Sequence, residues 1–311
     1  MRRLSIFALS ALLALAGAYA AETLTYGGIT IEVSERGAEL SRVYDSATGT
    51  EYLWLGDPAF WGGHDTVLWP FVGRLQDGKY TYNGETYSLK MHGFASSSDF
   101  ELVERTESSL SFQITSNEET LKSYPFEFVF TVRYSIEGNS VIEELIVENT
   151  GDGPLVYGIG GHPGFNVPLE EGLEFTDYCI EFPDAGKVKR CLFAGTPLMS
   201  GIEEETDTVT DGRMDLRHDL FLDDAVVLSG TGERAVLRSA KGERAVEVSY
   251  PGARWVGVWQ MPKPDAPFVC IEPWWTLPGP SGEILDFGTA EDLYRVPEGG
   301  TVSHRIMLTL L

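Results

Sequence analysis

Tyr80-Thr81-Tyr82-Asn83-Gly84-Glu85-Thr86-Tyr87 carries the clearest structural signal in the chain. Tyr80-Thr81-Tyr82 and Glu85-Thr86-Tyr87, which are rich in tyrosine and threonine as strands are, flank Asn83-Gly84. Asn-Gly is the preferred dipeptide of a type I′ turn, because both of its central positions need a positive φ. The stretch therefore predicts a tight antiparallel hairpin.

Short strand-like segments separated by turn residues continue in both directions from this hairpin. Upstream, Leu24–Val33 alternates around Gly27-Gly28. Downstream, the expected strands are Phe100–Val103, Ser109–Ile114, Phe126–Tyr134, Val141–Val147, Ala225–Leu228, Ala235–Leu237, Ala245–Val248, Trp255–Trp259, Phe268–Ile271 and Thr301–Leu310. Only Glu118–Tyr124 is expected to form a brief helix. The sequence predicts an all-β protein, a large antiparallel β-sandwich.

The N-terminal segment has the pattern of a secretory signal. Arg2 and Arg3 precede the apolar run Leu4–Leu15, and Ala18-Tyr19-Ala20 is a small-x-small cleavage site. A membrane anchor is the alternative, but the apolar run is short for a span. We expect residues 1–20 to be cleaved and the protein to be exported, periplasmic or secreted, with no membrane attachment afterwards.

The remaining residues, 21–311, contain no linker-like tract and are expected to form one domain. The periodicity of residues 170–222 is weak, which predicts an excursion from the sheets. The formal net charge is −24, and loss of Arg2 and Arg3 makes it −26. Such a chain repels nucleic acid and anionic membranes, so neither is expected as a partner.

The three cysteines are too few for a disulfide scaffold. Cys179–Cys191 is the only plausible disulfide, across a possible hairpin, whereas Cys270 lies in an apolar strand and is expected to be a small buried hydrophobe. No Cys or His spacing resembles a zinc site, and the sequence contains neither a phosphate-binding loop nor a dinucleotide-binding fingerprint. We therefore predict no metal and no cofactor.

Two stretches offer side chains for acid–base chemistry. In Gly160-Gly161-His162-Pro163-Gly164-Phe165-Asn166, the glycines allow close approach of a backbone or ligand to an imidazole that titrates near neutral pH. In Phe268-Val269-Cys270-Ile271-Glu272-Pro273-Trp274-Trp275, strand alternation places Phe268, Cys270 and Glu272 on one face. Loss of solvation raises the basicity of Glu272, and Trp274 and Trp275 offer faces on which a sugar could stack. A structural His162 and an ion-paired structural Glu272 are the alternatives.

Further polar residues end other apolar stretches. Arg74 and His92 each adjoin a glycine, and each could contact a ligand or a buried backbone carbonyl. Asp223-Asp224 precedes an expected strand, where capping or a turn is the simpler interpretation.

Taken in order, the motifs resemble the aldose 1-epimerase (galactose mutarotase) family, and most closely its LacX-like branch. The resemblance covers nearly the whole chain after the signal, and the matching motifs are Gly37-Ala38-Glu39-Leu40, Glu51-Tyr52-Leu53-Trp54, Trp69–Leu75, His92-Gly93-Phe94-Ala95, Gly161–Asn166 and Cys270–Trp274. It implies a β-sandwich of the galactose-mutarotase type and cofactor-free exchange of sugar anomers.

The resemblance also implies roles for single residues. His162 corresponds to the family's general acid and Glu272 to its general base, while Arg74 and His92 correspond to sugar-binding residues. The family's substrate-binding aspartate corresponds to Asp224, or to Asp223 one residue away. Removing a proton from the C1 hydroxyl and delivering one to the ring oxygen opens a cyclic sugar, which an imidazole and a carboxylate can do together.

Three other functions fit the sequence less well. A hexose-6-phosphate 1-epimerase would need more cations than the motifs supply. A catalytically silent carbohydrate-binding protein would not need an acid–base pair. A glycoside hydrolase or lyase would need two carboxylates at a defined separation, and only Glu272 has a suitable setting.

Overall fold

The computed structural model describes residues 20–195, 197–263 and 265–311 of the chain. Nearly all of the predicted signal, residues 1–20, lies outside the described residues. The first strand begins at Ala21, directly after the predicted cleavage site.

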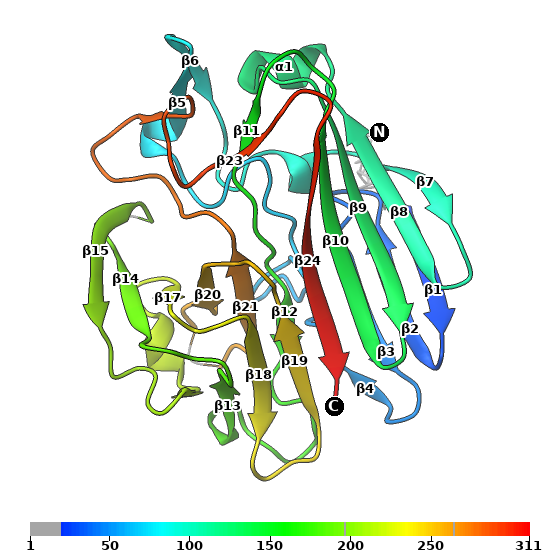
Figure 1. Ribbon diagram of the computed structural model, residues 1–311. Coiled ribbons are helices and arrows are strands. Elements are labelled where there is room, and N and C mark those ends of the chain that lie inside the picture. The colour runs from blue at the N-terminus through cyan, green and yellow to red at the C-terminus, as the bar shows by residue number, and fades with distance from the viewer. Residues whose placement is uncertain (1–19, 196, 264) are drawn as a thin grey trace, which may run out of the picture.

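A nine-stranded antiparallel sheet forms one side of the molecule (Figure 1). Its order is β16-β13-β18-β19-β24-β10-β9-β8-β7. The strands are β7 (Glu101–Arg105), β8 (Ser109–Thr115), β9 (Phe128–Glu137), β10 (Ser140–Asn149), β13 (Tyr178–Glu181), β16 (Arg213–Asp215), β18 (Arg234–Ser239), β19 (Ala245–Ser249) and β24 (Thr301–Leu310). The long strands β9, β10 and β24 lie side by side near its centre, and β24 pairs with both β10 and β19.

A six-stranded sheet packs behind the first one, in the order β12-β21-β20-β17-β14-β15. Its strands are β12 (Gly164–Asn166), β14 (Lys189–Phe193), β15 (Met199–Glu205), β17 (Val226–Ser229), β20 (Trp255–Trp259) and β21 (Phe268–Trp274). The predicted strands at Ala225–Leu228, Trp255–Trp259 and Phe268–Ile271 all belong to this sheet. The two large sheets confirm the predicted all-β, antiparallel sandwich.

Smaller elements complete the described part of the fold. They are β1 (Ala21–Tyr26), β2 (Ile29–Ser34), β3 (Leu40–Asp45), β4 (Thr50–Glu51), β5 (Lys79–Tyr82), β6 (Glu85–Ser88), β11 (Leu155–Tyr157), β22 (Leu285–Asp286), β23 (Tyr294–Val296), helix α1 (Glu118–Ser123), and short 3-10 turns at Gln76–Gly78, Ala95–Ser97, Phe175–Asp177 and His218–Phe221. The hairpin β5–β6 turns at Asn83-Gly84, both with positive φ. The predicted hairpin is confirmed, and so is the brief helix.

Aromatic and branched side chains fill the space between the sheets. Alternate residues of β9 point inwards, among them Phe128, Phe130 and Val132, each fully buried. Trp69, also fully buried, packs on this row with ring-centroid distances of 4.6 Å to Phe128 and 4.5 Å to Phe130. The indole therefore holds the chain segment before Arg74 against the nine-stranded sheet.

Two sequence predictions are wrong. Residues 170–222 do not leave the sheets, because β13 and β16 extend the nine-stranded sheet whereas β14 and β15 extend the six-stranded one. Cys179 and Cys191 are both free thiols. They cannot meet across a hairpin, since β13 carries Cys179 in one sheet and β14 carries Cys191 in the other. Cys270 is fully buried, as predicted.

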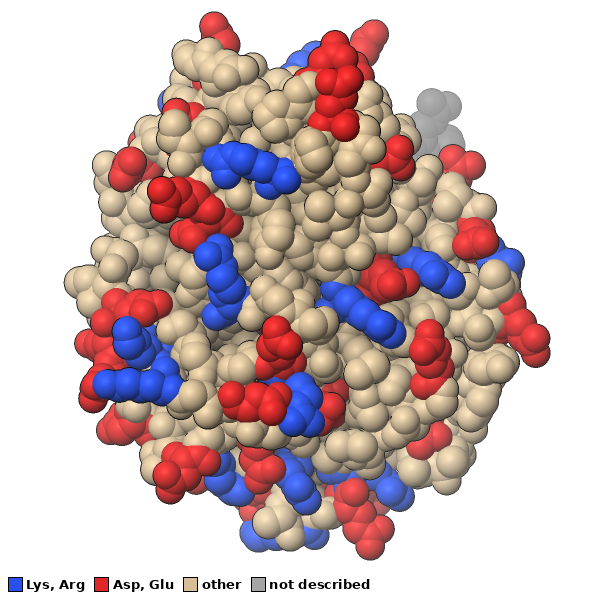
Figure 2. Space-filling view, viewed as in Figure 1, with Lys and Arg blue, Asp and Glu red and all other residues tan. Residues whose placement is uncertain are grey.

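The surface carries both signs of charge despite the negative total. Figure 2 shows acidic side chains across one face with basic ones between them, and several form pairs, such as Arg234 with Asp184 at 2.7 Å. None of the helices in residues 20–195, 197–263 and 265–311 has the length and apolar character that crossing a membrane requires.

Replacing Trp69 with alanine should strongly destabilise the protein, because it removes a large, fully buried side chain from between the sheets. We expect the free energy of unfolding to fall by about 3–5 kcal/mol, measured by urea denaturation followed by far-UV circular dichroism. Ile202→Ala is the control, since Ile202 lies on β15 and is 56% exposed, and it should change stability by about 0.5 kcal/mol or less. If both variants lost the same free energy of unfolding, Trp69 would contribute no more to stability than an exposed residue.

Candidate active site

Strand β21 presents two different faces. Val269 and Ile271 point into the core between the sheets. Cys270 and Glu272, on the alternate positions, point to the opposite side of the six-stranded sheet, where smaller clusters of apolar residues and a pocket lie. The predicted alternation is confirmed, and it places a carboxyl group at the floor of the pocket.

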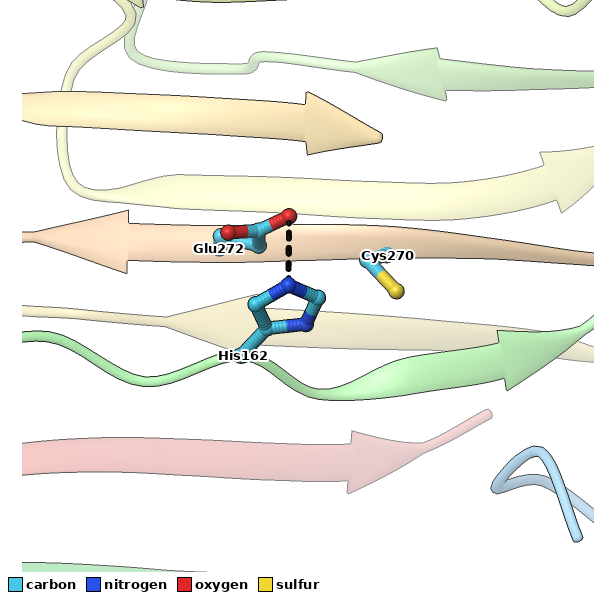
Figure 3. A group of neighbouring side chains, drawn as sticks. All are labelled: His162, Cys270 and Glu272. Atoms are coloured by element: carbon cyan, nitrogen blue, oxygen red, sulfur yellow. Dashed lines mark ion pairs between the residues drawn. The ribbon is translucent and has the colours of Figure 1, made fainter. Parts of the chain in front are cut away.

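The pairing register then brings an imidazole to that carboxyl group. Gly164 lies opposite Cys270, and Gly160 lies opposite Trp274. His162 is therefore directly across from Glu272, where antiparallel neighbours on one face have their Cβ atoms about 4.5–5.5 Å apart. Its Nε2 is 3.2 Å from Oε1 of Glu272, and Figure 3 shows the two groups projecting towards each other from adjacent segments.

Two glycines make this approach possible. A Cβ atom on Gly161 would lie 2.2 Å from Cδ1 of Ile306 on β24, and one on Gly164 would lie 2.8 Å from the Trp61 ring. Both distances are far inside van der Waals contact. The glycines around His162 are needed because the segment is compressed between β24 and an aromatic wall, as the sequence indicated.

The pocket has a volume of about 540 Å³, within the range usual for small-molecule sites. It contains the acid–base pair and the other polar residues that the sequence singled out, together with Trp274 but not Trp275. The side chains lining it are Trp61, Thr66, Gly73, Arg74, Met91, His92, His162, Phe193, Pro197, Leu222, Asp223, Asp224, Ala225, Trp259, Pro262, Glu272, Trp274 and Pro278. Segments distant in the chain thus converge on one cavity.

Burial controls the protonation of the central pair. It lowers the pKa of His162 to about 3, and nearby His92 lowers it further. It raises the pKa of Glu272 well above its ordinary value, and the charge of Asp224 adds to this. Both directions favour uncharged forms, so burial favours a protonated carboxyl group next to an imidazole nitrogen able to accept its proton.

His92 and Arg74 stand beside the pair. The Nδ1 atom of His92 accepts a hydrogen bond from the Gly73 backbone N–H at 3.1 Å. Burial, with a smaller effect of the Arg74 charge, lowers the pKa of His92 to about 4. His92 is therefore a neutral imidazole whose remaining N–H can donate to a ligand, and Arg74 supplies an exposed cation at the same edge of the pocket.

Both candidate aspartates line the pocket, but they differ in setting. Asp224 has a φ of 125°, a backbone conformation that non-glycine residues rarely adopt, and its Oδ1 accepts a hydrogen bond from the Ala225 N–H at 2.8 Å. Its charge acts on Glu272. Asp223 is more exposed. The geometry favours Asp224 as the aspartate that faces the pair.

The site belongs to a fold with known relatives. The family model for aldose 1-epimerase matches residues 22–276. The chain belongs to this family. Protein LacX from Lactococcus lactis subsp. lactis is 32% identical over 258 residues, which cover 79% of this chain and 84% of LacX.

Solved structures of family-like proteins superpose closely on the chain. A galactose mutarotase related enzyme from Lactobacillus acidophilus is 34% identical, with a TM-score of 0.87 and coverage of 94% of this chain and 97% of that one. A galactose mutarotase-like protein from Lactobacillus casei is 28% identical, with a TM-score of 0.88 and coverage of 94% and 100%. The galactose-mutarotase type of sandwich follows from these matches.

The aromatic wall of the pocket was only partly predicted. Trp274 lines it, but Trp275 points into the core, 1% exposed, so its predicted stacking role is wrong. Half-buried Trp61 and Trp259 lie nearest the imidazole instead, with ring centroids 4.9 Å and 5.6 Å from that of His162. Trp61 stands in a Gly-rich stretch, and that setting was the one sequence signal for it.

A buried acidic pair beneath the His162 segment was also missed. Asp65 is 1% exposed and lies in a β-bridge with Pro163. Glu143 on β10 is 3% exposed, and Oε2 of its carboxyl group would be 3.8 Å from a Cβ on Gly161. Burial raises the pKa of both groups, that of Glu143 to about 7. No sequence pattern marks such a pair, because its burial depends on how the sheets pack.

The stability of the protein should fall as Glu143 ionises. Its folded-state pKa is about 7 against an ordinary 4.5, so the folded state binds more protons than the unfolded state between these values, and stability is lost as the pH rises through them. We expect Glu143→Gln to gain stability relative to the unsubstituted protein, by on the order of 1–3 kcal/mol, between pH 4.5 and pH 8. Urea denaturation at several pH values measures the difference.

Glu144→Gln is the matched control for this experiment. Glu144 is the next residue of β10 but points to the other face, where it is partly exposed and 3.5 Å from Arg133. The Glu144→Gln substitution should change the free energy of unfolding by a small amount that is nearly constant with pH. A Glu143→Gln difference that also stays constant with pH would contradict the raised pKa.

Proposed function

We propose that the protein is an aldose 1-epimerase that interconverts the α and β anomers of a free hexose without a cofactor. One observation carries the proposal: a histidine and a glutamate, buried and 3.2 Å apart, form the floor of a pocket of about 540 Å³. The exocyclic and ring oxygens of an aldose are attached to the same carbon, so two adjacent acid–base groups can reach both.

The proton balance of the reaction suits this pair. When the shared proton has moved from Glu272 to His162, Glu272 takes the proton of the C1 hydroxyl while His162 protonates the ring oxygen, and the C1–O bond of the ring breaks to give the open-chain aldehyde. The pair is then left with a protonated carboxyl and a neutral imidazole, which is the state that burial favours. After rotation about C1–C2, the reverse transfers close the ring on the other face.

The remaining polar residues would hold the sugar. The N–H of His92 and the guanidinium of Arg74 can donate to hydroxyl oxygens, and the carboxylate of Asp224 can accept from hydroxyl groups. Trp61 and Trp259 offer apolar faces for the C–H side of a pyranose, next to His162. This combination of flat apolar walls and a few oriented polar groups suits a neutral carbohydrate.

The charges in the pocket support a free sugar over a sugar phosphate. Among the described residues that line it, Arg74 is the only Lys or Arg, whereas Asp223, Asp224 and Glu272 are acidic. A phosphate group would usually be held by several cationic or N–H donors. We therefore place hexose 6-phosphates second among the candidate substrates.

We also propose that the enzyme acts outside the cytoplasm, because residues 1–20 have the pattern of a cleavable signal. Expressed with this segment in a bacterial host, the protein should be recovered from the exported fraction with Ala21 as its first residue, determined by N-terminal sequencing. Recovery of uncleaved protein from the membrane fraction would favour the anchor.

The acid–base pair can be tested by polarimetry. The purified protein should speed the change in optical rotation of freshly dissolved α-glucose or α-galactose. Glu272→Gln and His162→Ala should each reduce the rate by roughly 10²-fold or more, because each removes one of the two proton-transfer groups. Both variants should keep the circular dichroism spectrum of the unsubstituted protein.

Glu203→Gln serves as the control, since this acidic residue lies on β15 outside the pocket, and it should leave the rate unchanged. Unaltered rates in either active-site variant would remove that residue from the mechanism. Sugar binding by calorimetry without any acceleration across a panel of aldoses would instead identify a carbohydrate-binding protein.

A further inference from the structure

A third donor atom accompanies the acid–base pair. A ring nitrogen of His162, Sγ of Cys270 and a carboxylate oxygen of Glu272 all lie within 4.8 Å of one another. The strand register explains the cluster, because Cys270 and Glu272 are alternate residues on one face of β21 and His162 is the cross-strand neighbour of Glu272. Figure 3 shows the three side chains together.

The donor set has the chemistry of a zinc ligand set. Zn²⁺ binds imidazole nitrogen at about 2.0 Å, carboxylate oxygen at about 2.0–2.2 Å and thiolate sulfur at about 2.3 Å, in tetrahedral geometry. Donor atoms bound to one ion lie closer together than the 4.8 Å that spans these three atoms here. Small side-chain rotations must therefore bring the three donors closer before they can share an ion. We propose that His162, Cys270 and Glu272 form a site for a borderline-soft divalent cation such as Zn²⁺, and that the bound ion inhibits the enzyme.

The place of the site explains the inhibition. His162 and Glu272 line the pocket, whereas Cys270 is fully buried behind it. A bound ion would occupy the two side chains needed for proton transfer. This consequence for activity rests on the proposed function, but binding of the ion does not.

The surroundings favour a cation. Two further carboxyl side chains, Asp223 and Asp224, line the same pocket. The exposed Arg74 at the pocket edge is the opposing charge. The ion must displace the proton of the Cys270 thiol and that of the Glu272 carboxyl group, and both are released to solvent. Sulfur as a ligand favours Zn²⁺ over the harder Mg²⁺ and Ca²⁺.

Binding can be measured directly with metal alone. Zn²⁺ affinity is obtained by competition with a chromophoric chelator, and Co²⁺ serves as a spectroscopic probe because a thiolate ligand gives a ligand-to-metal charge-transfer band in the near ultraviolet. We expect one ion per chain and a thiolate band in the unsubstituted protein. Cys270→Ser should abolish the band and weaken Zn²⁺ binding by at least roughly tenfold.

Two further variants keep the result interpretable. Cys270→Ala tests the same ligand if the serine variant folds poorly, and folding is checked by thermal denaturation. Cys179→Ala is the matched control, since Cys179 is also a buried free thiol but lies on β13 in the other sheet. It should bind Zn²⁺ and Co²⁺ like the unsubstituted protein. Affinity unchanged by loss of Cys270, or no binding of either metal, would overturn the proposal.

The activity measurement separates this proposal from the proposed function. Zn²⁺ should slow mutarotation by the unsubstituted protein and the chelator EDTA should restore it, with inhibition at least roughly tenfold weaker in Cys270→Ser relative to its own uninhibited rate. Absence of mutarotase activity in metal-free protein would reject the function while the Co²⁺ spectrum still tests the site. Zn²⁺ binding at Cys270 without inhibition would overturn the inhibitory role.

Discussion

The alignment of the His162 segment against β21 is the constraint on which the rest of the site depends. Opposite positions in an antiparallel pair share a face, so one register places the imidazole over the Glu272 carboxyl group. A shift by one residue would turn Glu272 towards the core side, which Val269 and Ile271 occupy. The requirement that the apolar residues of β21 face the core therefore also fixes the position of its polar residues.

The nine-stranded sheet supports this alignment from behind. Ile306 on β24 fills the space that a side chain at position 161 would need. The buried carboxyl groups of Asp65 and Glu143 lie on the same side of the segment. The hydroxyl of Tyr134 donates to the Ala38 carbonyl at 2.8 Å and lies 3.1 Å from Oε1 of Glu143, which connects this polar layer to the core. The acid–base pair is thus held by packing across two sheets, which gives it a defined geometry.

Local patterns in the sequence predicted the features that local forces determine. Asn83-Gly84 specified its hairpin because the turn requires positive φ at both positions, and the alternation of Val269 to Glu272 specified which side chains share a face. The partners of β13 and β14 were not predictable in this way, since their pairing depends on distant strands. Residues 170–222 contribute to both sheets and therefore have no continuous pattern. The burial of Asp65 and Glu143 was not predicted for the same reason, since it arises only in the assembled sandwich.

The position of β24 has a consequence for how the molecule reaches its native state. This strand follows all other described strands in chain order, yet it lies inside the nine-stranded sheet, between β10 and β19. Until it is inserted, β10 and β19 have open edges with unpaired backbone groups, which are prone to intermolecular association. A polypeptide arranged in this way gains its cooperative structure late, and a holdase chaperone would have an extended interval in which to keep it unfolded.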